Sequence, residues 1–180
     1  MKRYLYILPA LMMLMMASCE QKPTLQKYFV EKSETKDFAT LDIGKSVIKT
    51  DKLKLSAEEQ KALESVDKLN VLIFKSNKDN ANTFNTEKAT IKSVLQEDHY
   101  DELMKVSLGG GGMSVSTKGE GEHIEEFVLF LHNKDAGMGV LRVLGDDMTP
   151  NNVMTIVNII QKGGMDSTQL KPLMDIMKKN

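Results

Sequence analysis

Apolar residues recur along this chain with two different periods, one typical of helices and one typical of strands. In residues 25–31, and again in residues 57–66 or beyond, they recur every three or four positions, which predicts amphipathic helices. Ser56 and Glu59 add a capping-box pattern before the second of these segments. Residues 38–43 alternate at every second position and therefore predict a strand between the two helices.

The middle of the chain continues with one strand and one helix. Residues 71–74 are an unbroken apolar run between polar flanks, too short for a helix, so residues 70–75 are expected to form a strand buried on both faces. Residues 77–82 are polar and predict a loop. Residues 86–97 regain the helical spacing and predict a further amphipathic helix.

The second half of the chain is dominated by the alternation typical of strands. Turns rich in Gly, Asn and Asp separate four runs that predict strands: residues 102–108, 113–118, 125–132 and 138–145. Because three successive connections are short, these strands are expected to form an antiparallel meander.

Two helices are predicted after the meander. Thr149 and Pro150 supply an N-cap and a first-turn proline, and Gly163 and Gly164 end the segment. Residues 170–177 again carry apolar side chains at helical spacing and predict a last short helix. The order of elements predicts a two-layer α+β fold, with a mixed, mostly antiparallel sheet and helices packed largely on one face.

The first 18 residues differ from the rest of the chain. Lys2 and Arg3 precede the uncharged, mostly apolar residues 4–16, a layout typical of a signal peptide. A helix of that length reaches about 20 Å, short of the roughly 30 Å hydrocarbon core of a bilayer. A transmembrane anchor is therefore not expected.

The only Cys follows this segment directly. Cys19 stands after small residues, in a sequence that resembles the lipobox of bacterial lipoproteins. The resemblance implies cleavage before Cys19, acylation of its sulfur and amino group, and stable anchoring to membrane lipid by two or three acyl chains. Residues 1–18 would then be the signal peptide, residues 19–24 a lipidated tether and residues 25–180 a single domain. The alternatives are an ordinary secretory signal with an incidental Cys, or a soluble protein with an apolar N-terminus.

Composition narrows the classes of function. The 24 Lys and Arg residues balance 25 Asp and Glu residues, so the chain has no uniform basic field and nucleic-acid binding is not expected. A single Cys excludes an intramolecular disulfide, and once Cys19 carries lipid no thiol remains for catalysis or for a metal. With 41% hydrophobic residues the chain is too apolar to be wholly disordered.

Four consecutive glycines, Gly109 to Gly112, are the most conspicuous local motif. A P-loop would need a later Gly-Lys-Ser/Thr that opens a helix, and a dinucleotide loop would need spaced glycines between a strand and a helix. Residues 113–116 instead continue with the alternation of a strand. The glycines are therefore interpreted as a flexible hairpin turn.

Three histidines and several carboxylates are further candidates for chemistry. The histidines His99, His123 and His132 have carboxylates nearby at Asp98, Asp101, Glu122 and Glu125. No pair of histidines has the i, i+4 spacing of a zinc-binding helix, and the odd separation of His123 and His132 predicts opposite faces of a strand. The histidines are interpreted as solvated or turn residues, and no metal, cofactor or catalytic site is assigned. No serine lies in a G-x-S-x-G motif.

Two acidic residues and a group of methionines complete the candidates. Asp146 and Asp147, beside Thr149, lack the alternating ligands of a calcium loop and are interpreted as an acidic turn before a helix. Several methionines are assigned to core packing rather than to a plastic binding groove: Met154, Met165, Met174 and Met177.

The chain resembles a known family in residues 25–31, 38–43, 102–104 and 140–146. That family is domain of unknown function 4252, a family of small bacterial lipoproteins. The resemblance covers nearly all of the chain after the signal peptide, but the matching segments are structural. It implies a lipid-anchored α+β domain and transfers no active-site residue.

Two hypotheses of different class follow from these features. The first is a non-catalytic binding or regulatory module that lies outside the cytoplasm and is anchored by lipid on Cys19. The periplasmic face of the outer membrane is favoured over the inner membrane, and an envelope protein is the candidate partner. The second is a hydrolase-like enzyme whose site assembles only in space, and a structural envelope protein is a third option. A cavity that joins a His to a carboxylate would favour the enzyme, and an apolar patch ringed by polar residues would favour binding.

Overall fold

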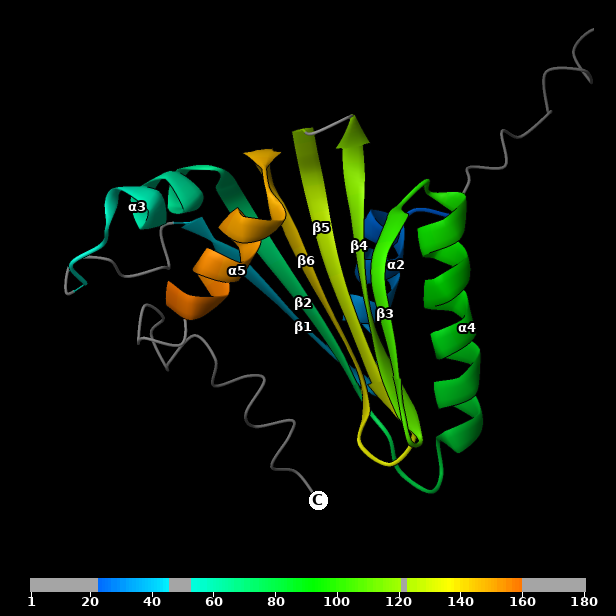
Figure 1. Cartoon of the computed structure of the whole chain (residues 1–180). Helices are drawn as coiled ribbons and strands as arrows, with labels where there is room; N and C mark the ends of the chain where they lie inside the picture. The colour runs from blue at the N-terminus through cyan, green and yellow to red at the C-terminus, as the bar shows by residue number, and fades with distance from the viewer. Residues whose placement is uncertain (1–22, 46–52, 121–122, 160–180) are drawn as a thin grey trace, which may run out of the picture.

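Six antiparallel strands form one sheet in the part of the chain that the computed structural model describes, residues 23–45, 53–120 and 123–159 (Figure 1). The strands are β1 (Phe38–Gly44), β2 (Val66–Lys75), β3 (Asp101–Leu108), β4 (Gly111–Glu120), β5 (His123–Asn133) and β6 (Gly137–Met148). The helices are α2 (Leu25–Ser33), α3 (Ala57–Glu64), α4 (Ala81–Glu97) and α5 (Pro150–Ile159).

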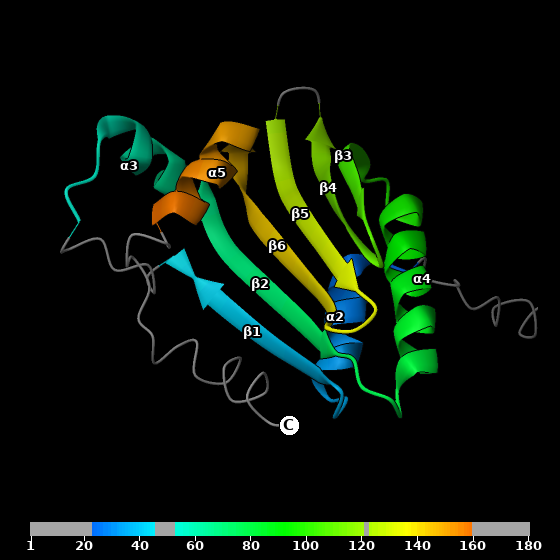
Figure 2. The same cartoon turned by 60° about the horizontal axis from the view of Figure 1, so that its bottom comes forward.

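The strands follow the order β1-β2-β6-β5-β4-β3, which Figure 2 shows from left to right. Strands β3 to β6 pair in sequence order, so the predicted meander is confirmed. Strands β1 and β2 join the β6 side of the sheet, and α4 carries the chain from β2 to the far edge, where β3 begins. The predicted α+β class is confirmed, and every described strand pairing is antiparallel rather than mixed.

Buried side chains gather in two clusters, one on each face of the sheet. Alternation along β2 places Leu72 and Phe74 in one cluster and Leu69 in the other. Side chains of α2 and α4 complete the first cluster, on what we call the α4 face, and side chains of α3 and α5 complete the second, on the α5 face. The helices, predicted largely on one face, are thus divided between the two faces.

The helix predicted over residues 57–66 or beyond is shorter than expected. Helix α3 ends at Glu64, and Val66 already begins β2. The three-residue spacing of Val66 and Leu69 imitates a helix because a bulge between Val66 and Lys68 adds one residue to the strand. Both side chains therefore reach the same cluster on the α5 face.

Helix α4 begins at Ala81, inside the segment that was expected to be a loop. Phe84 in its first turn is buried against Phe74, with ring centroids 6.3 Å apart. Glu87 is buried one turn later, because its carboxylate accepts a hydrogen bond of 2.8 Å from the hydroxyl of Tyr28. In the missed first turn, Phe84 is the only large apolar side chain among polar neighbours, which is why the sequence predicted a later start.

The remaining predicted elements agree with the structure where it describes them. Ser56 and Glu59 form the expected capping box at the start of α3. Thr149 accepts a hydrogen bond from the backbone of Asn152 at the start of α5, as an N-cap does. The predicted stop at Gly163 and Gly164 and the last helix, residues 170–177, lie outside the described residues.

Candidate functional site

A cavity of about 520 Å³ opens on the α4 face, between α4 and strands β3, β4 and β5. Its volume lies within the range of about 300–1,000 Å³ that is typical of small-molecule sites. The side chains that define its chemistry come from all four elements: Lys92, Lys105, Ser114, Ser116, Phe130 and His132.

Small residues of β4 create this space. On the α4 face, β4 presents Gly112, Ser114 and Ser116, and the last two pair with Phe130 and Val128 of the buried cluster. A hydrogen atom or a hydroxymethyl group fills far less volume than the Leu or Phe that usually faces a helix. The sheet and α4 therefore leave a gap here instead of a close-packed core.

The hydroxyl groups in the cavity are available to a ligand. Ser116 is a buried residue, only 4% exposed, and the side chains of Ser116 and Ser114 make no hydrogen bond to any described residue. A serine hydroxyl can donate one hydrogen bond and accept two. A molecule in the cavity can therefore form hydrogen bonds with both hydroxyls.

Lysines outnumber carboxylates at the cavity, where Lys92, Lys105 and Glu102 are the charged residues of the lining. Lys88 and Lys92 lie one turn apart on α4, and Lys105 of β3 has Glu102 as its partner, with Nζ and Oε2 3.4 Å apart. Burial lowers the pKa of His132 below its ordinary value, and the charges of Lys92 and Lys88 lower it further. The ring of His132 is therefore neutral at neutral pH and can both donate and accept a hydrogen bond.

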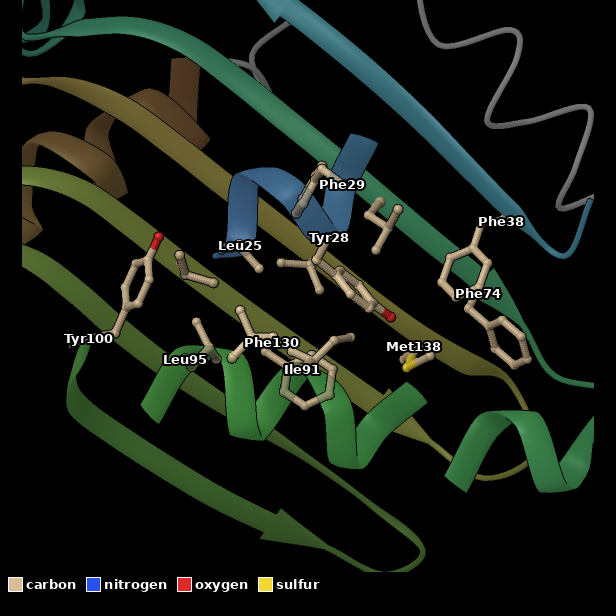
Figure 3. Close-up of a cluster of buried hydrophobic side chains, with 14 of the residues drawn as sticks. Leu25, Tyr28, Phe29, Phe38, Phe74, Ile91, Leu95, Tyr100, Phe130 and Met138 are labelled. Carbon is tan, nitrogen blue, oxygen red and sulfur yellow. The ribbon is translucent and has the colours of Figure 1, made fainter. Parts of the chain in front are cut away.

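Tyr100 also lines the cavity and is held by a buried polar network. Figure 3 shows its ring at one end of the cluster, beside Leu95 of α4. The hydroxyl of Tyr100 donates to Glu126, and Arg142 binds both oxygens of that carboxylate, with Nε–Oε2 and Nη2–Oε1 distances of 2.8 and 2.6 Å. Arg142 also donates to Gln26 of α2. These contacts make Tyr100 a fixed wall of the cavity.

The pKa values of this network follow from the same contacts. Burial alone would raise the pKa of Glu126, but hydrogen bonds from Arg142 and Tyr100 lower it below its ordinary value. Burial, together with the neighbouring Glu126 carboxylate, raises the pKa of Tyr100, so its hydroxyl stays protonated. Neither group is poised to exchange a proton near neutral pH.

A second concavity, of about 660 Å³, lies on the α5 face near the turns of the meander. Ile73, Met113 and Leu131 form its apolar floor, in one row across the sheet with Gly139 between Ile73 and Leu131. Leu131 is 46% exposed, so α3 and α5 do not cover this part of the face. The groove is thus an apolar patch with the polar residues Asn133 and Asp135 at its edge.

The structure does not bring the three histidines together. His99 lies between α4 and β3, His123 begins β5 beside Asp147, and His132 stands near the end of β5. A bulge after Ile124 breaks the alternation on which the prediction of opposite faces depended. His132 is half-buried in a strand, which corrects its interpretation as a solvated or turn residue. In the described part of the chain, no group of three His, Cys, Asp or Glu side chains is placed to hold a metal.

Two of the four glycines form a turn, and the other two begin a strand. Gly109 and Gly110 make the two-residue turn between β3 and β4, and φ of Gly110 is +82°, a value that favours glycine. Gly111 and Gly112 already belong to β4, and a side chain on Gly111 would overlap the carbonyl oxygen of His132. The hairpin interpretation is confirmed for the first two glycines, whereas the other two permit a close approach of β4 to β5.

The acidic residues and the methionines also differ from their interpretation. Asp146 and Asp147 are strand residues near the end of β6, and the carboxylate of Asp147 contacts the ring of His123. Met154, assigned to the core, is 58% exposed because Val153 beside it takes the inward position on α5. The other methionines of that group lie outside the described residues: Met165, Met174 and Met177.

One family model matches residues 28–156, more than half of the chain, and its description is Domain of unknown function (DUF4252). The chain belongs to the DUF4252 family. The resemblance seen in the sequence is therefore confirmed. The match runs from within α2 to within α5, so it includes the whole sheet and the cavity of this DUF4252 domain. No curated protein and no solved structure matches the chain.

The residues expected to anchor this DUF4252 chain, the signal peptide and Cys19, lie outside the described residues. Within the described part, none of the helices combines the length and apolar character that crossing a bilayer requires.

The cavity of the DUF4252 domain has only a weak signal in the sequence. Its signal is residues 112–116, in which small side chains alternate with the larger Met113 and Val115. That pattern predicts a strand that has small side chains on one of its two faces. It does not tell which of the two faces a helix covers. Lys92 and Lys105 come from distant elements, and only the fold brings them to the same cavity.

Proposed function

We propose that this chain is a binding module, anchored at a membrane by lipid on Cys19, whose cavity on the α4 face holds a small molecule. The observation that carries the proposal is the hydroxyl of Ser116. It belongs to a residue that is only 4% exposed and that lines a cavity of about 520 Å³, and the hydroxyl has no partner among the described residues. A ligand in the cavity can exchange hydrogen bonds with this hydroxyl in place of water.

The lining favours binding over catalysis. Among the described residues no hydrogen bond joins His132 to a serine hydroxyl or to a carboxylate, so no nucleophile is activated in the way that acyl transfer needs. The carboxylate of Glu126, which accepts a hydrogen bond from Tyr100, forms an ion pair with Arg142. Fixed polar groups over an apolar floor are the usual composition of a small-molecule site.

The N-terminal sequence supports the location of this module. The lipobox-like segment that ends at Cys19 would export the chain and hold it at a membrane outside the cytoplasm, with the periplasmic face of the outer membrane favoured. The ligand is then a molecule of the cell envelope or of its surroundings.

Filling the cavity tests the proposal. Ser114→Phe places a ring in the cavity from a half-buried position on β4, and Ser93→Phe makes the same change on the exposed side of α4. The full chain is purified from cells in detergent, and small molecules released by denaturation are identified by mass spectrometry. We expect the wild type and Ser93→Phe to retain one compound in common and Ser114→Phe to lose it about tenfold.

Two outcomes would contradict the proposed function. One is equal retention of the compound by Ser114→Phe and by the wild type, with unchanged thermal melting of both. The other is that no compound is retained by the wild type above the level in Ser114→Phe.

A further inference from the structure

The protein neutralises the positive charge at the cavity only in part, because two lysines, Lys92 and Lys105, and one carboxylate, Glu102, line it. Lys92 makes no ion pair among the described residues, and Lys88 contacts the ring of Phe84, 5.4 Å from its centroid. The pair of Lys105 and Glu102 is about half exposed, so solvent screens it and Glu102 remains only a partial counter-charge.

The three carboxylates that bond to residues of the buried cluster have cations of their own. Each one in contact with the buried cluster forms a separate pair: Glu87 with Lys32, Asp98 with Lys118 and Glu126 with Arg142. They are therefore not available to Lys88 and Lys92. The lowered pKa of His132, caused first by burial and then by these two lysines, agrees with a positive potential in the cavity.

An apolar floor accompanies this charge. Phe130 of β5 and Leu95 of α4 are buried and line the cavity from both sides. The hydroxyls of Ser114 and Ser116 stand on the neighbouring strand. A ligand that uses the whole site therefore has a charged or polar head and an apolar body.

We propose that the cavity binds a small organic acid as its anion, with the carboxylate held by Lys92 and Lys105 and the apolar body on Phe130. The inference rests on the proposed function and adds the charge and the shape of the ligand. A single anionic head suits this site because the described lining contains no arginine and only one of the two lysines lacks a partner. The serine hydroxyls and the neutral ring of His132 donate hydrogen bonds to the carboxylate oxygens.

Three probes with the same apolar body test the charge of the ligand: 3-phenylpropanoate, 3-phenylpropanamide and 3-phenylpropylamine. Their affinities for the full chain in detergent are measured by calorimetric titration. We expect the acid to bind on the order of tenfold more tightly than the amide and the amine to bind most weakly, because only the acid complements the lysines. The advantage of the acid should shrink as salt is added.

Matched lysine variants locate the charge. Lys92→Gln should lower the affinity for the acid several-fold and leave that for the amide unchanged. Lys61→Gln removes the same charge from an exposed position on α3 and should change neither affinity. In addition, the ring signals of His132, followed by nuclear magnetic resonance, should titrate at higher pH with the acid bound than with the amide, since a nearby anion raises the pKa of a histidine.

The outcomes separate this inference from the proposed function. Equal affinities for the acid and the amide, both abolished by Ser114→Phe, would overturn the anionic ligand and leave a binding cavity. Binding of the acid that neither Lys92→Gln nor Ser114→Phe reduces would place it outside the cavity and overturn the inference. Failure of all three probes to bind at millimolar concentration would also overturn the inference of an anionic ligand. The proposed binding function would then still be tested separately, by whether the wild type retains a compound.

Discussion

Arg142 and Glu126 carry opposite charges in side chains that are only 7% and 16% exposed. Removing such charges from water costs several kcal/mol for each ion, and only good geometry with further hydrogen bonds offsets that cost. The two parallel bonds between Arg142 and Glu126, with Gln26 and Tyr100 as further partners, provide this geometry. The network therefore couples α2, the wall of the cavity and two central strands.

Glu126→Gln should lower the free energy of unfolding by about 3 kcal/mol or more. The reason is that the buried charge of Arg142 loses its counter-charge, whereas the volume of the side chain hardly changes. The measurement is urea denaturation of the wild type and the variant. Glu102→Gln is the control, because its ion pair is about half exposed and should contribute less than about 1 kcal/mol. A similar loss in both variants would contradict the role assigned to the network.

His132 should make stability depend on pH. Its pKa is lowered in the folded state, by burial first and then by Lys92 and Lys88, so below the ordinary value of about 6.5 the unfolded chain binds more protons than the folded chain. The contribution is therefore fully present above that value and is lost as the pH falls. The free energy of unfolding, measured between pH 5 and pH 8, should decline less toward pH 5 in His132→Gln. Identical pH profiles of the two proteins would rule this contribution out.

The hairpin of β3 and β4 shows how one run of glycines serves two elements. Gly109 has open space where a side chain would begin, as expected in a turn. A side chain on Gly111 would instead meet the backbone of β5, because β4 and β5 approach closely beside His132. Gly112 lies next to the ring of His132, which lines the cavity.

Substitution should separate these two roles. Gly109→Ala should change the free energy of unfolding by less than about 1 kcal/mol, because nothing obstructs the methyl group and the unfolded chain loses some freedom. Gly111→Ala should cost roughly 1–3 kcal/mol, since the backbone of β5 must move. Urea denaturation of both variants gives the comparison. Equal stability of the two would show that all four glycines act only as a flexible turn.

At the scale of the whole molecule, the tether would hold the cavity close to the membrane. The backbone N–H of Leu25, the first residue of α2, donates to Asp98 at 3.3 Å, and Asp98 stands two residues before Tyr100 in the cavity wall. The expected tether, residues 19–24, spans at most about 20 Å when fully extended. If Cys19 is acylated, the cavity therefore opens near the lipid surface.

Cys19→Ala should abolish lipidation and release the protein from the membrane. The acyl chains need the sulfur of Cys19, and the sequence contains no second Cys. Cells are grown with labelled fatty acid, and the label on the protein and its distribution between membrane and soluble fractions are measured. Ser116→Ala, a change in the cavity, serves as the control and should keep the label. Equal labelling of Cys19→Ala and the wild type would contradict the lipoprotein interpretation.

Local pattern was sufficient for most elements of this fold. The four strands of the meander, the capping box of Ser56 and the N-cap of Thr149 each depend on residues within a few positions of one another. Prediction failed where a distant partner altered the pattern. The bulge in β2 made Val66 look helical, and the first turn of α4, whose polar residues predict a loop, is held by the packing of Phe84 against Phe74.

The sequence by itself determined the α+β class, the antiparallel meander and the family of this chain, because alternation, turns and caps are short-range properties. Only the tertiary structure decided which face of each strand meets α4 and which meets α5. A period of two tells that Ser114 and Ser116 share a side, but it does not tell what covers that side. The cavity with Lys92, Lys105 and His132 exists because pairing across the sheet and the crossing of α4 bring distant residues together.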